Sequence, residues 1–164
     1  MPLVEFRDYL KPYHRKSTLE DVVSLYPILR DADKREVKTL GVTPERALVY
    51  AYTHSSVCRT ICNRIDNPVA MFGVVPISKI SGSVWLLGSN ELPKIKTAFL
   101  RHSKQEVIKL NNTYPHLFNI IDSRNHLHVR WIKWCGFKII GETKVNNIKF
   151  YEFCRVNTNG ISTN

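Results

Sequence analysis

Apolar residues recur along this chain with two different periods, and their alternation predicts a mixed α/β domain. Strand-like runs occupy residues 57–65, 69–75, 83–87, 117–122, 137–143 and 148–155, with a looser alternation at 3–8. Helical spacing fills residues 17–40, which Pro27 interrupts, and then 43–54, 92–112 and 125–135. The predicted order is β-α-α-β-β-β-α-β-α-β-β. An antiparallel hairpin beside a β-α-β crossover indicates a mixed sheet with helices on both faces.

Local signals support the predicted element boundaries. Ser17 or Thr18 can cap the first helix, and Thr43-Pro44 is a typical helix start. Gly41 is expected to end the preceding helix. Asn146-Asn147 predicts the turn of the last hairpin.

Length and charge narrow the class of protein. The 164 residues suffice for one domain with a hydrophobic core, expected to span residues 1–156 with a flexible tail at 157–164. No secretory signal and no membrane-spanning segment are expected, so we predict an intracellular protein without a membrane partner. The net charge of +10 favours polyanionic partners. Its densest part, residues 94–109, is expected to form the solvated basic face of a helix.

The four cysteines are expected to be reduced thiols. Cys58, Cys62, Cys135 and Cys154 match no zinc-binding spacing, and we predict no metal site.

The segment NHLHVRWIKWCGF, residues 125–137, carries the most specific signal. An Asn opens a short amphipathic helix after a strand, and a Gly-Phe pair closes it eleven residues later. This segment resembles the closing part of the GNAT (GCN5-related N-acetyltransferase) superfamily. The resemblance spans about residues 30–155 and implies the GNAT fold, with the helix lying beside the acetyl-CoA tail.

Further strings narrow the resemblance to one subgroup. AMFGVVP at 70–76, WLLG at 85–88 and FLRHS at 99–103 resemble GNAT-like proteins of short-tailed bacteriophages, the internal virion protein A or acetyltransferase-like proteins. This resemblance implies a location in the host cytoplasm or in the virion. It also implies a phage structural protein or nucleic acid as a partner of the basic face.

The resemblance implies acetyl-CoA as the cofactor, held by the strand 83–87 and the next helix, 92–112. The cleft is expected between the strands 83–87 and 117–122, as parallel neighbours that separate toward their carboxyl ends. Strand backbone would hold the pantetheine arm, and a glycine-rich loop would cradle the pyrophosphate at a helix N-terminus. Here that loop keeps one glycine and includes Glu91 and Pro93, so weak binding is expected. The expected cofactor-binding residues are Leu86, Leu87, Gly88, Ser89, Asn90, Lys94, Asn119, Asn125 and Trp131.

The catalytic groups are less well defined. Many GNAT enzymes have a Tyr seven residues after the helix Asn, and here that residue is Ile132, which cannot donate a proton. Asp122 is the candidate general base, with capping of the next helix as its alternative role. His128 is expected at the surface or core edge, and Arg130 is expected to pair with Asp122.

Two functions therefore remain open. The first is an acetyl-CoA-dependent N-acyltransferase acting on an amine. The second is a non-catalytic GNAT-fold protein of virion morphogenesis, or a counter-defence protein, that binds DNA or an assembly partner. Fold alone does not decide between them, because the choice depends on the site.

Overall fold

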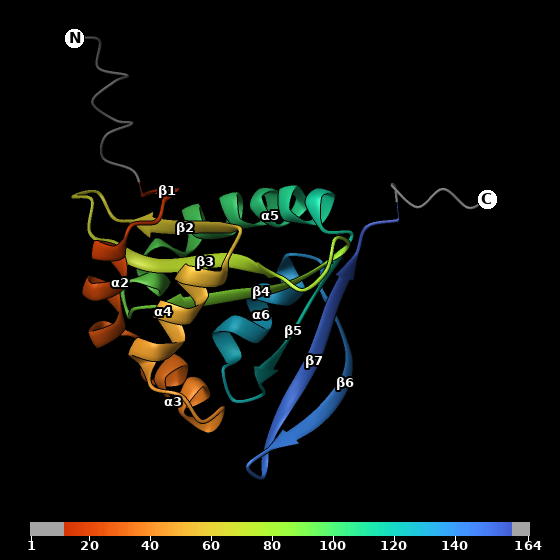
Figure 1. Cartoon of the computed structure of the whole chain (residues 1–164). Coiled ribbons are helices and arrows are strands. Elements are labelled where there is room, and N and C mark those ends of the chain that lie inside the picture. The colour runs from red at the N-terminus through yellow and green to blue at the C-terminus, as the bar shows by residue number, and fades with distance from the viewer. Residues whose placement is uncertain (1–11, 159–164) are drawn as a thin grey trace.

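A seven-stranded mixed sheet forms the centre of the computed structural model, which describes residues 12–158 (Figure 1). The strand order is β1-β2-β3-β4-β5-β7-β6. All neighbours pair antiparallel except β4 and β5, which pair parallel. The strands are β1 (Tyr13–Lys16), β2 (Val57–Cys62), β3 (Pro68–Pro76), β4 (Ser81–Gly88), β5 (His116–Asp122), β6 (Lys138–Val145) and β7 (Ile148–Val156).

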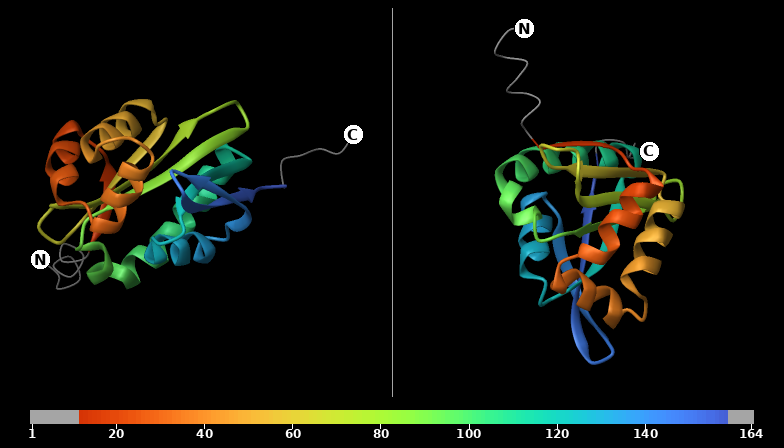
Figure 2. Two further views of the ribbon diagram at one scale, coloured as in Figure 1. Left: turned by 90° about the horizontal axis from the view of Figure 1, so that it is seen from below. Right: turned by 90° about the vertical axis from the view of Figure 1, so that its left-hand side faces the viewer.

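Helices cover both faces of this sheet, which confirms the predicted fold class. Helices α2 to α4 lie on one face, and α5 and α6 lie on the other (Figure 2). The helices are α2 (Leu19–Leu25), α3 (Asp31–Thr39), α4 (Pro44–His54), α5 (Lys96–Thr113) and α6 (His126–Trp134), with 3-10 turns η1 (Tyr26–Ile28) and η2 (Leu92–Ile95).

The predicted boundary signals are confirmed. The Thr18 and Asp21 side chains bond each other's backbone N–H groups in a capping box, and Thr43 accepts a bond from the N–H of Arg46. Gly41 has a φ of +87° after α3, a conformation that costs glycine little. Asn146 and Asn147 both have positive φ between β6 and β7, as the tight hairpin turn requires.

The expected strand at residues 3–8 lies outside the described residues. The structure adds β1, a short strand that the hydrophobic pattern did not reveal, and it corrects one predicted helix. The predicted helix 17–40 is two helices, because Pro27 lies in η1 and Leu29-Arg30 are extended. These two residues pair with the end of β4: Leu29 bridges Ser89, and the Arg30 N–H donates to the Gly88 carbonyl at 2.8 Å. This break sets the start of α3 against the end of β4.

Strand alternation gives each face of the sheet its own core. On the face covered by α2–α4, Met71 and Leu87 pack with Val22, Leu25 and Leu48. The opposite face packs against α5 and α6 and includes Phe72, Leu86, Leu110 and Ile132. The cysteines form no disulfide among residues 12–158; Cys62 and Cys135 are buried, and Cys58 and Cys154 are half-buried.

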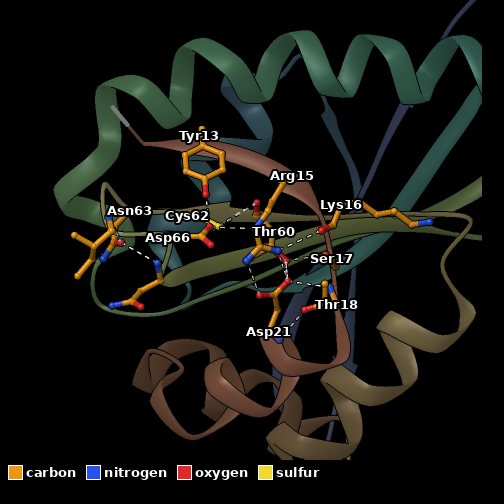
Figure 3. A network of polar contacts seen from close by, with 12 residues as sticks. Tyr13, Arg15, Lys16, Ser17, Thr18, Asp21, Thr60, Cys62, Asn63 and Asp66 are labelled. Atoms are coloured by element: carbon orange, nitrogen blue, oxygen red, sulfur yellow. Dashed lines mark hydrogen bonds and ion pairs between the residues drawn. The ribbon is translucent and has the colours of Figure 1, made fainter. Parts of the chain in front are cut away.

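A polar network ties β1 to α2 and β2 (Figure 3). Arg15 donates two bonds to the carboxylate of Asp21, at 2.8 and 2.9 Å, and a third to Asp66 at 3.2 Å. Thr60 also donates to Asp21, whose residue is only 3% exposed. A buried carboxylate is tolerated because it is paired and hydrogen-bonded.

No helix in the part of the chain that the structure describes is long and apolar enough to span a membrane.

Candidate active site

The sheet opens between its two parallel strands. Pairing of β4 with β5 covers only the three pairs from Ser81–His116 to Ser83–Phe118, although both strands continue. At the point of separation, the side-chain amide of Asn119 donates to the Val84 carbonyl at 2.7 Å and its oxygen accepts the N–H of Ile120. The prediction of parallel neighbours that separate toward their carboxyl ends is confirmed. The side chain of Asn119 substitutes here for the lost ladder bond.

A cleft of about 490 Å³ occupies the opening, and we call it the fork cleft. Strands β4 and β5 form its base, with walls from α3, α4 and α6. Most of its lining is apolar, but Glu36, Arg46, Asn119 and His128 also reach it. Among the residues predicted to bind the cofactor, the fork cleft brings together Leu86, Leu87, Asn119 and Trp131.

A second hollow of about 200 Å³, the side groove, lies between α6 and the start of α5. Its lining is mostly apolar and comprises Leu92, Pro93, Phe99, Leu100, Leu127, His128, Arg130, Trp131 and Trp134. His128 and Trp131 line both the fork cleft and the side groove. These two side chains therefore form the partition between the two hollows.

A buried polar cluster connects α3 to α6 at this partition. The amide nitrogen of Asn125 donates to the Asp33 carboxylate at 2.9 Å and to the Glu36 carboxylate at 3.1 Å, and lies 3.3 Å from His128 Nδ1. Asn125 itself is 1% exposed and makes no side-chain cap bond to α6. The side chain of Asn125 therefore joins α6 to α3 and does not cap α6.

Glu36 is the carboxyl group of this cluster that lines the fork cleft. Burial raises the pKa of its carboxyl to about 8, and the nearby charges of Asp33 and Asp122 add to that rise against the opposing bond from Asn125. Sequence reasoning missed Glu36, because nothing in α3 distinguishes it from the other acidic residues of an amphipathic helix. Only the packing of α3 against the end of β4 brings it to the site.

Three buried polar atoms have no hydrogen-bond partner within residues 12–158. They are Asn125 Oδ1, His128 Nε2 and Trp131 Nε1. Leaving such atoms unpaired costs about 1–3 kcal/mol each, so their clustering beside two hollows indicates a place for a ligand. His128 was expected at the surface or the core edge, and of these the surface position is wrong: the residue is 4% exposed, because it points from α6 toward Asp33 instead of into solvent.

Asp122, the predicted base, lies outside the linings of the fork cleft and the side groove and is paired with Arg124. Arg124 Nη2 contacts its carboxylate at 2.6 Å, and the Arg124 backbone N–H donates at 2.9 Å. Burial opposes ionisation, but these bonds outweigh it and hold the pKa of Asp122 below its usual value. Asp122 lines neither hollow. The expected ion pair between Arg130 and Asp122 was wrong. Arg124, in the turn before α6, pairs with Asp122, and Arg130 lines the side groove.

The expected pyrophosphate loop is closed on itself. The Gly88 N–H donates to the Asp33 carboxylate at 2.9 Å, and the Ser89 N–H donates to the Val69 carbonyl at 2.8 Å. The Glu91 N–H is used by the Ser89 hydroxyl, while Asn90 is exposed between them. Lys94 pairs with Glu91 at 2.8 Å and lines neither hollow. The amides of Gly88, Ser89 and Glu91 are therefore not free to bind a phosphate.

Comparison with known proteins places the fold. No family model and no curated protein sequence matches the chain. Solved structures do match. A GNAT superfamily phosphinothricin acetyltransferase from Sinorhizobium meliloti, in complex with AcCoA, is 11% identical with a TM-score of 0.68, and the match covers 94% of this chain and 92% of that one.

Two further structures support the same fold. A GCN5-related N-acetyltransferase from Kribbella flavida is 11% identical with a TM-score of 0.64, covering 89% of this chain and 98% of that one. A spermidine N-acetyltransferase from Vibrio cholerae, in complex with CoA and spermine, is 9% identical with a TM-score of 0.61, covering 89% and 95%. The chain therefore has the fold of the GNAT acetyltransferases.

Proposed function

We propose that the protein is an acetyl-CoA-dependent N-acyltransferase acting on a primary amine. The observation that carries this proposal is a carboxyl of raised pKa, Glu36, in a cleft that opens where β4 separates from β5. The fold is that of enzymes with this activity, but fold alone does not define a reaction. The ionisable group and the adjoining unpaired polar atoms supply the chemical argument.

Glu36 suits the task of preparing the amine. An amine that arrives protonated must lose a proton before its nitrogen can attack a carbonyl carbon. A general base works best when its pKa lies near the operating pH, and a carboxyl with a pKa of about 8 meets that condition where an ordinary glutamate does not. Glu36 also lines the cleft directly, whereas Asp122 is sequestered by Arg124.

The residues present fit the reactive end of acetyl-CoA. Asn125 Oδ1 and Trp131 Nε1 are buried and have no hydrogen-bond partner among residues 12–158, and the unpaired part of β4 lines the fork cleft. We assign Asn125, Trp131 and the backbone of Leu86 and Leu87 to the pantetheine and thioester end. When bound, acetyl-CoA would supply the acetyl group as a thioester.

The diphosphate end is expected to be held weakly. The loop amides of Gly88 and Ser89 already donate to protein acceptors, and Lys94 is neutralised by Glu91. We therefore propose that affinity comes mainly from the side groove and the fork cleft.

The surroundings of Glu36 favour an amine on an apolar body. Leu40, Val42 and Tyr50 line the fork cleft yet are 42%, 40% and 57% exposed, so they form an apolar rim around its mouth. Burying such a rim against a substrate is favourable by about 25 cal/mol per Å² of apolar surface. An aromatic amine such as 2-phenylethylamine is the matching probe.

The test combines binding and turnover. Calorimetry should show acetyl-CoA binding to the wild-type protein, and thiol release with 2-phenylethylamine should report transfer. Glu36→Gln should lower kcat by about 100-fold, whereas Glu45→Gln, an exposed carboxylate on α4, should leave it unchanged. Absence of binding, or equal activity of the two variants, would refute the proposal.

The alternative proposal is a non-catalytic role in phage particle assembly or counter-defence, through the basic face of α5. Arg101, Lys104 and Lys109 are exposed there, although Lys109 pairs with Glu106 and Lys104 lies over the ring of Trp134. Trp134 is itself 51% exposed. A gel-shift assay with DNA, comparing wild type with Arg101→Glu/Lys104→Glu, tests this alternative.

A further inference from the structure

The partition between the two hollows contains an ionisable group for which the proposed function has no role yet. Of the two partition residues, Trp131 cannot exchange a proton at ordinary pH, whereas the His128 imidazole can. His128 is the titratable side chain that lines both the fork cleft and the side groove in the described part of the chain. Any proton that must pass between the hollows meets this ring.

The neighbours of His128 fix which ring nitrogen carries the hydrogen of the neutral imidazole. Nδ1 lies 3.4 Å from Asp33 Oδ1 and 3.3 Å from the Asn125 amide nitrogen. The two hydrogens of that amide are used by shorter bonds, to Asp33 at 2.9 Å and to Glu36 at 3.1 Å. The hydrogen of the neutral ring therefore belongs on Nδ1, directed at Asp33. Nε2 then keeps a lone pair, and it is buried without a partner.

Asp33 is itself held rigidly. Its carboxylate accepts the Gly88 N–H at 2.9 Å and contacts Arg30 Nη1 at 3.4 Å, and the residue is 1% exposed. A fixed carboxylate at Nδ1 orients an imidazole, selects its tautomer and stabilises the ring when it becomes charged. Asp33, Asn125 and His128 thus have the arrangement of an oriented proton acceptor.

We propose that His128 is the proton shuttle of the acyl transfer, taking a proton from the amine in the fork cleft and giving it to sulfur at the side groove. This inference rests on the proposed function. As the amine nitrogen bonds to the acetyl carbon and the carbon–sulfur bond breaks, the nitrogen loses a proton and the sulfur needs one. His128 Nε2 accepts the first and donates it as the second, so the ring ends as it began. Glu36 removes the earlier proton, the one that makes the amine an ammonium.

The electrostatics of the ring suit a shuttle. Burial lowers the pKa of His128, the Asp33 carboxylate opposes that effect, and Arg30 adds to it. The ring is therefore neutral at the start and able to accept a proton, while Asp33 stabilises the transient imidazolium. Besides Asp33 and Arg30, the carboxyl of Glu36 also lies close to the ring, because it accepts a bond from the same Asn125 amide. A His in this role also accounts for an active site with Ile132 where the resemblance expects a tyrosine.

A leaving-group experiment separates the shuttle from a packing role. His128→Gln should lower kcat with acetyl-CoA and 2-phenylethylamine by about 100-fold. With the selenium analogue of acetyl-CoA, the loss should be smaller, because a selenolate departs without a proton while the amine must still give one up. His126→Gln, an exposed histidine of the same helix, is the control and should behave as wild type with both donors. A loss of equal size with both donors, or no loss with acetyl-CoA, would overturn the shuttle and leave the acyltransferase proposal intact.

A spectroscopic readout tests the same assignment without turnover. Nitrogen NMR of ring-labelled histidine should show His128 as the neutral Nδ1–H tautomer at pH 7, with Nε2 changing most when acetyl-CoA is added. The Nε2–H tautomer would overturn the proposal even if His128→Gln failed to fold. A wild-type protein that transfers acetyl to neither 2-phenylethylamine, a lysine peptide nor spermidine would overturn the acyltransferase proposal, and the shuttle with it.

Discussion

Replacing Glu36 by glutamine should stabilise the protein at alkaline pH while it impairs transfer. Glutamine keeps an oxygen that can accept the Asn125 amide, but it removes a charge that burial, Asp33 and Asp122 all disfavour. A carboxyl that is costly to ionise is expected where function, and not stability, selects the residue.

The size of the effect follows from the pKa of Glu36. Between its ordinary value of 4.5 and about 8, the unfolded chain has released a proton that the folded protein retains, so wild-type stability falls as pH rises through this window. The interval corresponds to a ceiling of about 5 kcal/mol, at about 1.4 kcal/mol per pKa unit. Because the Glu36 side chain is only half-buried, we expect about 2 kcal/mol.

Urea unfolding of wild type and Glu36→Gln at several pH values measures this difference. The gap should be near zero below about pH 5 and reach about 2 kcal/mol in favour of the variant above about pH 8.5. Effects of His128 cancel because both proteins contain it. A variant that is equally stable or less stable at high pH would refute the assignment of a raised pKa to Glu36.

Three further substitutions test other parts of the structure. Asp122→Asn should lower stability by about 1–2 kcal/mol through loss of the Arg124 pair, with kcat changed less than about threefold; a large fall in kcat would restore Asp122 as the base. Arg15→Ala leaves the buried Asp21 without its ion pair and should cost about 3 kcal/mol in urea unfolding, where a loss below about 1 kcal/mol would show that Asp21 does not need that pair. Gly136→Ala, at a φ of +86°, should lower the free energy of unfolding by about 1 kcal/mol, and an unchanged midpoint would contradict the strain argument.

The sequence by itself determined the order of elements and the place of the fork. Period-two apolar runs predict strands because side chains alternate between faces, and the long helix between residues 83–87 and 117–122 requires a parallel crossover. The opening of α6 at Asn125 and its closure at Gly136 were also local features, since caps and turns depend on adjacent residues. Leu86, Leu87, Asn119 and Trp131, which the resemblance assigned to the cofactor, line one cleft.

The tertiary structure alone decided the chemistry of the site. Glu36 and Asn125 are 89 positions apart and meet because Leu29-Arg30 leave the helix and pair with the end of β4. Burial then raises the pKa of Glu36, while an adjacent arginine neutralises Asp122, the acid that sequence position favoured. A side chain's ionisation depends on what surrounds it in space, and hydrophobic periodicity carries no information about which polar groups share a buried site.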